Sequence, residues 1–162
     1  VIDVAADAAV GGVVAGRCRG LDKPALIRVP FLTLPGGDPL VLSAANVFVS
    51  VFVDPEPAAI DWAADLGADR VELYTEPYAR AFEQGGDALK ASLATYRGAA
   101  EHAAACNLGV NAGHDLDLDN LPTFLSVPHV EEVSIGHALM ARAMFVGLSK
   151  VVREYLALTG SR

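Results

Sequence analysis

The chain has 162 residues, of which 52% are hydrophobic, and this is enough to build one globular domain with a real core. Its formal net charge of −8 argues against a nucleic-acid-binding surface, because a phosphate backbone selects for clustered lysine and arginine. The sequence has no apolar run of the roughly 20 residues that a membrane span needs, and its first residues lack the pattern of a signal peptide. The two cysteines, Cys18 and Cys106, have no metal-ligand spacing, so we expect a protein of the reducing cytoplasm.

From residue 47 onward, short β-rich segments alternate with longer helical ones. Segment 47–54 is almost continuously apolar and β-branched, as expected of a strand that is buried on both faces. The predicted strands are residues 47–54, 70–75, 110–113 and 130–136, and the predicted helices are residues 55–68, 87–109, 118–128 and 137–159. This alternation predicts parallel strands joined by right-handed crossovers, in either a doubly wound sheet or part of a (β/α) barrel.

Residues 1–46 differ from the rest of the chain. They are rich in glycine and proline and show no sustained period of a helix or strand, although residues 25–29 and 31–34 could form short strands. The glycines of "GGVVAG", residues 11–16, fit neither a P-loop nor a dinucleotide-binding fingerprint. We therefore expect an irregular segment that ends near residue 46.

Two predicted strands end in a Gly-His pair. In "VNAGH", the small residues Ala112 and Gly113 leave room for a ligand before His114, whose imidazole can donate a proton near neutral pH. In "SIGH", Gly136 and His137 begin a helix, and the N–H groups of a helix N-terminus attract anions. A lone histidine is more often structural, but the repeated pair favours a functional site.

Glu72 lies between apolar residues inside a predicted strand, where a carboxylate is costly unless it faces a polar cavity. An ion pair with Arg70 is the structural alternative. We expect Glu72 to point into the same cavity as His114, at the carboxyl ends of the strands. Glu72, His114 and His137 could also form a two-histidine, one-carboxylate metal site, although no spacing requires it.

Three aspartates follow the first Gly-His pair. Asp115, Asp117 and Asp119 have the spacing of the first three ligands of an EF-hand calcium loop. However, the sixth and twelfth positions of that loop, which should be Gly and Glu, are Asn120 and Ser126 here. We expect Asp117 and Asp119 to cap the following helix instead. The remaining histidines, His102 and His129, are expected at the surface.

The segments "VSVFVD", "VELYTEPYA", "VNAGHDL" and "VSIGHALMARAMFVGL" resemble the pyridoxine 5'-phosphate synthase family in order and spacing. The resemblance covers about residues 49–160 and implies a (β/α)8 TIM barrel, a homo-octamer, and no metal or organic cofactor. Such enzymes condense 1-deoxy-D-xylulose 5-phosphate with 3-amino-2-oxopropyl phosphate and release phosphate and water. The resemblance further implies that His114 is the proton donor and that Glu72 stabilises the transition state. It also implies that Asp115, Gly136 and His137 bind the aminooxopropyl phosphate.

The sequence departs from the family pattern at two positions. Asp115 stands where glycine is common in the family, and Glu76 follows Thr75 where the family has a Thr-Gly pair. A carboxylate at position 115 suits a phosphate site only if its side chain turns away to cap the helix. The four βα units correspond to the family's fifth to eighth strands. We therefore expect a half-barrel over residues 47–162 that is inactive alone, and a frameshift or truncation scar over residues 1–46.

Two alternatives stay open. One is a half-barrel that binds phosphate esters or self-associates without catalysis, through Gly136 and the last helix. The other is a metal-dependent lyase or aldolase that uses Glu72, His114 and His137.

Overall fold

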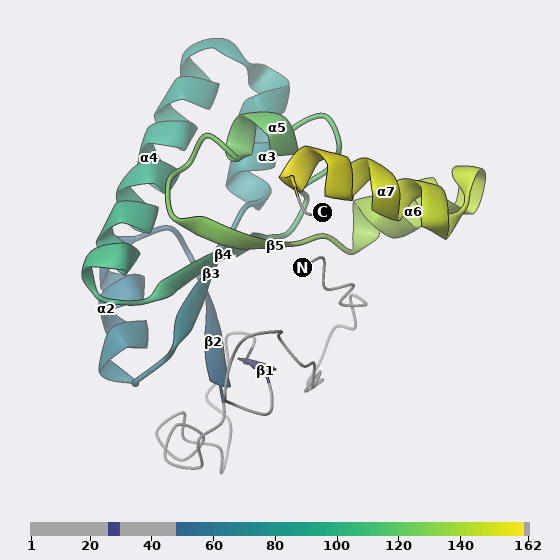
Figure 1. The fold of residues 1–162 in the computed structure, drawn as a ribbon. Helices are drawn as coiled ribbons and strands as arrows, with labels where there is room; N and C mark the ends of the chain where they lie inside the picture. The colour runs from purple at the N-terminus through teal and green to yellow at the C-terminus, as the bar shows by residue number, and fades with distance from the viewer. Residues whose placement is uncertain (1–25, 30–47, 161–162) are drawn as a thin grey trace.

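The computed structural model describes residues 48–160 and, for their backbone alone, residues 26–29. These residues form one sheet of five parallel strands that follow one another in chain order (Figure 1): β1 Leu26–Val29, β2 Phe48–Val53, β3 Arg70–Tyr74, β4 Gly109–Gly113 and β5 Val130–Ser134. The four strands predicted after residue 46 are confirmed, and the fragment at residues 25–29 adds β1. Residues 11–16 and 31–34 lie outside the described ranges.

The strand order separates the two predicted architectures. A doubly wound sheet reverses its order at a switch point, whereas a (β/α) barrel adds each strand beside the preceding one. Here β1 to β5 stand in sequence, and every neighbouring pair is parallel. The described strands therefore have the order of a barrel wall.

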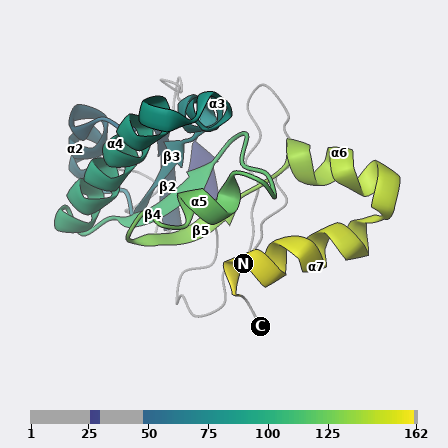
Figure 2. The same ribbon diagram turned by 90° about the horizontal axis from the view of Figure 1, so that it is seen from above.

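Helices α2 Pro57–Asp65 and α4 Gly86–Ala105 cover one face of the sheet (Figure 2). Because side chains alternate along a strand, this face collects the apolar set of each strand. Its buried residues are Val49, Val51, Val53, Val71, Leu73, Val110, Ala112 and Val133, and they pack with Ile60, Ala63, Ala100 and Ala103 of the helices. The opposite face carries the polar residues of the strands, among them Ser50, Arg70, Glu72, Asn111 and Ser134.

The last predicted helix is wrong in one respect, because residues 137–159 form two helices. α6 His137–Val146 ends at Gly147, which has a φ of +85°, and α7 Leu148–Thr159 begins there. The two helices lie side by side as a hairpin (Figures 1 and 2). Arg142 of α6 donates to both carboxylate oxygens of Glu154 of α7, at 2.6 and 3.1 Å. The break at Gly147 was not predicted because the residues on both sides of it have good helix propensity.

Two further helices lie in the loops between strands. α3 Glu76–Gln84 was not predicted. Gly85 separates it from α4. α5 Leu121–Phe124 is shorter than the predicted helix at residues 118–128. Every helix in the described part of the chain is too short or too polar to cross a membrane.

A buried aromatic cluster joins three of these helices. Tyr78 of α3, Tyr96 of α4 and Phe124 of α5 have ring centroids 4.8 to 6.1 Å apart. Each of the three side chains is at most 1% exposed. The hydroxyl of Tyr78 donates to the carbonyl of Asn120 at 2.7 Å, so the cluster also fixes the turn before α5.

Alkaline pH should destabilise this fold. Burial raises the pKa of Tyr78 and of Tyr155 from 10.0 to about 12, and raises the pKa of Tyr96 as well. The unfolded chain loses these protons near pH 10 while the folded chain keeps them, so the stabilisation is complete below pH 10 and is lost as the pH rises towards 12. Urea unfolding followed by circular dichroism should show a constant midpoint up to about pH 9.5 and a decline above it. Tyr155→Phe should make the decline shallower, and a midpoint unchanged at pH 12 would contradict the expectation.

Candidate active site

The residues singled out in the sequence lie at the carboxyl ends of β3, β4 and β5. The strand register pairs Glu72 with Asn111 and pairs Gly113, the last residue of β4, with Ser134 of β5. His114 follows β4 directly. Gly136 and His137 follow β5 after one further residue. Parallel strands end at the same edge of a sheet, so this edge gathers both Gly-His pairs and Glu72, as active sites do in barrels.

Glu72 is buried, with 5% of its surface exposed, and its carboxylate lies over Gly113. A Cβ atom built on Gly113 would collide with Oε1 of Glu72 and would lie 2.9 Å from Cβ of Ser134. Only glycine permits this close approach. The room at Gly113, expected to receive a ligand, is therefore occupied by Glu72, while Ala112 is buried on the opposite face of the sheet.

Polar contacts continue along this face of the sheet. The guanidinium of Arg70 donates to Oδ1 of Asn111 at 2.7 Å and to the carboxylate of Glu131. Oγ of Ser50 and Nδ2 of Asn111 are buried without a hydrogen-bond partner in the structure. A buried polar atom without a partner costs free energy, so this face is not satisfied by the contacts it makes in the structure.

The imidazole of His114 is oriented by residues from β3 and by its own neighbour. It lies edge-to-face on the ring of Tyr74, with centroids 5.1 Å apart, and its Nδ1 is 3.1 Å from Oδ2 of Asp115. The hydroxyl of Thr75 donates to the His114 carbonyl. The side chain is 41% exposed, so the imidazole is fixed in direction and open to a ligand.

The backbone at this point is strained. His114 and Asp115 have φ values of +88° and +56°, in the left-handed region that L residues with a Cβ rarely adopt. Strain of this kind costs about 1 to 3 kcal/mol per residue and gathers at functional sites. The contacts of Thr75 and Asn120 hold the two residues in place: Nδ2 of Asn120 donates to the Asp115 carbonyl at 2.9 Å.

The carboxylate of Asp115 does not cap the helix but lies beside His114. Oδ1 of Asp117 accepts hydrogen bonds from the N–H groups of Asp119 at 2.9 Å and Asn120 at 2.8 Å, and so closes the turn that leads into α5. The helix itself has Asn120 at its N-cap and no side-chain capping hydrogen bond, so the capping predicted for Asp117 and Asp119 is not found at α5.

Gly136 and His137 open α6. The Gly136 carbonyl accepts the first hydrogen bond of the helix, from the N–H of Met140 at 2.9 Å. The N–H groups of the first turn have no partner within a helix, and they carry the positive end of its dipole. His137 is exposed and can add a donor at the same end, so the start of α6 is suited to bind an anion.

Three residues of this site were not predicted from the sequence. Tyr74 could have been found, because the period of two in a strand places it on the same face as Glu72. Thr75 and Asn120 act through backbone contacts of a loop, for which the sequence carries no periodic signal.

The metal arrangement proposed for Glu72, His114 and His137 does not form, because within the described ranges these residues do not bring their ligand atoms within 4.8 Å of one another. His129 is exposed, as expected, whereas His102 is partly buried beside Asp61.

Comparison with known proteins gives one consistent result. The model of the family "Pyridoxal phosphate biosynthesis protein PdxJ" matches residues 40–161. The pyridoxine 5'-phosphate synthase of Porphyromonas gingivalis is 47% identical over 113 residues, which are 69% of this chain and 46% of the relative. Those of Bacteroides thetaiotaomicron and Xanthomonas campestris pv. campestris are 46% and 54% identical, over 70% and 68% of this chain and 47% and 43% of the relatives. The chain thus spans about half the length of the curated relatives it matches.

Proposed function

This chain belongs to the family of the pyridoxal phosphate biosynthesis protein PdxJ, and we propose that its βα units form part of a pyridoxine 5'-phosphate synthase active site. The reaction joins 1-deoxy-D-xylulose 5-phosphate to 3-amino-2-oxopropyl phosphate through an imine, dehydrations and proton transfers. The observation that carries the proposal is the place of the Glu72 carboxylate, which is buried over Gly113, the residue that precedes the oriented His114. In this proposal a charge stabiliser and a proton donor share one edge of a barrel-type sheet.

The proposed roles follow from the surroundings of each group. His114 donates the proton that lets water leave, because its ring is accessible and its direction is set by Tyr74 and Asp115. Glu72 stabilises the positive charge of the iminium-like transition state. A buried carboxylate does this well, since its field is screened little and it needs no reorganisation. Gly136, His137 and the backbone N–H of Asp115 bind the aminooxopropyl phosphate, with the phosphate at the start of α6.

We propose that strands β2 to β5 of the described sheet belong to the C-terminal half of a (β/α)8 barrel, in residues 47–162. The sequential parallel order supports this, and so do the unpartnered polar atoms of Ser50 and Asn111 on the face that would line the barrel. The other half would come from further strands. The family resemblance implies that those strands carry a histidine and a glutamate that act as bases, and a loop that binds the pentulose phosphate. Residues 1–46 are a segment apart in this proposal, although the family match extends back to residue 40.

We also propose a homo-oligomer, an octamer as the resemblance implies, in the cytoplasm where phosphorylated metabolites are found. The α6–α7 hairpin exposes large apolar side chains, with Met144 at 83% and Phe145 at 89%. Such a patch is unusual on a monomer and favours contact with another copy. Light scattering of the purified chain that gave a monomer at all concentrations would refute self-association.

The test of the function is a chimera. Residues 47–160 of this chain replace the aligned segment of the Xanthomonas campestris relative, which supplies the remaining strands. We expect the chimera to form pyridoxine 5'-phosphate from the two substrates, and the chain alone to form none. An inactive but folded chimera would refute the catalytic proposal, and saturable binding of phosphate esters without turnover would favour the non-catalytic alternative.

Asp115→Gly in the chimera should bind phosphate more tightly. The substitution removes a negative charge from the site and places glycine at a backbone position with a φ of +56°, where it is unstrained. Two like charges about 4 Å apart repel by about 1 kcal/mol in a water-like medium, so we expect roughly fivefold tighter binding of inorganic phosphate, measured by calorimetry. Asp119→Gly, a neighbouring aspartate, is the matched control. Equal affinities in the two variants would show that Asp115 does not face the anion.

A further inference from the structure

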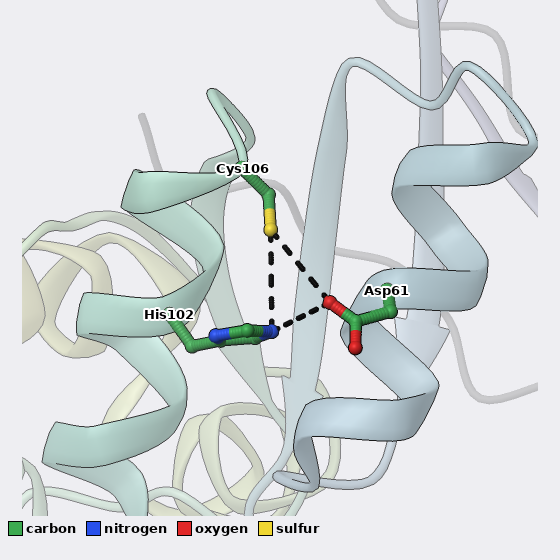
Figure 3. Close-up of side chains that lie close together, drawn as sticks. All are labelled: Asp61, His102 and Cys106. Carbon is green, nitrogen blue, oxygen red and sulfur yellow. Dashed lines mark hydrogen bonds and ion pairs between the residues drawn. The ribbon is translucent and has the colours of Figure 1, made fainter.

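A second cluster of chemically reactive side chains lies on the outer helices. Asp61 comes from α2, His102 comes from the last turn of α4, and Cys106 is the C-cap residue that directly follows α4 (Figure 3). The spacing of four residues places His102 and Cys106 on one face of α4. Nε2 of His102 is 2.6 Å from Oδ1 of Asp61, and Sγ of Cys106 is 3.9 Å from that oxygen and 4.0 Å from that nitrogen.

The geometry of the cluster differs from that of a nucleophile relay. In a relay the carboxylate binds one ring nitrogen of the histidine and the nucleophile binds the other. Here the carboxylate and the thiol both approach Nε2, as Figure 3 shows, while Nδ1 points away from them. One nitrogen, one oxygen and one sulfur therefore face a common point, which is the arrangement of metal ligands.

We propose that Asp61, His102 and Cys106 form a binding site for a divalent zinc-like ion, with water as the fourth ligand. Nitrogen, oxygen and thiolate sulfur are the ligands of Zn²⁺ in proteins. With metal–ligand bonds of about 2.0 to 2.3 Å, tetrahedral ligand atoms lie about 3.3 to 3.6 Å apart. The sulfur thus has to move inward by a few tenths of an ångström, and Nε2 and Oδ1 have to separate by about 0.7 Å from their present 2.6 Å.

The side chains are free enough to make this adjustment. Asp61 and His102 are 57% and 35% exposed, and Cys106 is partly buried. On binding, the metal–sulfur bond replaces the S–H bond of Cys106 and the thiol proton goes to solvent. The ion also replaces the hydrogen bond between Asp61 and His102, which leaves a neutral imidazole as ligand.

The position of the cluster assigns it a structural effect. Cys106 lies three residues before β4 begins at Gly109, whereas His114 follows the other end of that strand. The ion would therefore bind at the amino-terminal edge of the sheet, away from the candidate active site, and would tie α2 to α4. Residues at this edge of a barrel serve stability more often than catalysis. Metal binding should accordingly raise the melting temperature of the full chain.

The test uses the purified full chain and the metal alone. Titration with Co²⁺ should give a thiolate-to-cobalt charge-transfer band at one ion per chain, and Zn²⁺ should displace it and raise the melting temperature. Cys106→Ser should abolish the band, and Asp61→Asn and His102→Gln should weaken binding at least about tenfold. Cys18→Ser and His129→Gln are the matched controls and should bind as the parent chain does.

Three results would overturn the proposed metal site. A band that persists in Cys106→Ser but disappears in Cys18→Ser would assign the thiolate to the other cysteine and overturn the proposal. So would a folded parent chain, verified by circular dichroism, that binds neither ion. Asp61→Asn changes one exposed atom and leaves the helix intact, so unchanged affinity in that variant would equally overturn the three-ligand site.

Discussion

His114→Asn should lower the turnover of the chimera by about 10²- to 10⁴-fold, the usual contribution of a positioned general acid. This corresponds to about 3 to 5 kcal/mol of transition-state stabilisation. Asparagine keeps a polar side chain of similar reach but cannot release a proton near neutral pH. The loss should fall on kcat with little change in KM, because the proton moves in the transition state and not in the bound ground state.

Three companion variants make this result interpretable. Glu72→Gln keeps the size of the side chain over Gly113 and removes its charge, so a loss of kcat there measures electrostatic stabilisation. His129→Asn, an exposed histidine of a loop, should leave both constants unchanged. Thr75→Val removes the hydroxyl that holds the His114 carbonyl and should cost less than loss of the imidazole itself. A His114→Asn chimera that kept more than half of its turnover would disprove the proton-donor role.

The parts of the fold that the sequence predicted depend on short-range patterns. Segment 47–54 is almost continuously apolar, which is typical of a parallel strand buried on both faces, and parallel strands necessarily bring their carboxyl ends together. Glu72 and the two Gly-His pairs could therefore be placed at one edge of the sheet from the sequence alone. Their proposed chemical roles came from family resemblance and not from these patterns.

The features that were missed depend on contacts between distant residues or on a single backbone angle. The break at Gly147 needs a positive φ, which the surrounding helix formers do not signal. The contact of Asn120 with the Asp115 carbonyl depends on the shape of a loop. Asp61 and His102 are 41 residues apart and meet only because α2 and α4 pack on the same face of the sheet.

Phe124→Ala should destabilise the chain by about 3 to 5 kcal/mol, the range for truncating a buried phenylalanine. Phe124 is completely buried, and its ring packs edge-to-face on Tyr78 at 4.8 Å and Tyr96 at 5.4 Å. Three helices meet at this ring, so the cavity cannot close without moving one of them. For a domain of this size the melting temperature should fall by roughly 6 to 20 °C. Lys90→Ala is the control, since that side chain of α4 is 80% exposed and its loss should cost less than about 0.5 kcal/mol.

The same substitution should affect the candidate site. α5 carries Phe124 and begins directly after Asn120. The Asn120 carbonyl accepts a hydrogen bond from the Tyr78 hydroxyl, and the Asn120 side chain donates one to the Asp115 carbonyl. When the aromatic cluster loosens, the strained backbone of His114 and Asp115 loses part of its support and relaxes toward ordinary φ values. At a temperature where both variant chimeras remain folded, Phe124→Ala should therefore have a lower kcat than Lys90→Ala. Equal kcat values would mean that Thr75 and Tyr74 suffice to position His114, and that the aromatic cluster contributes to stability alone.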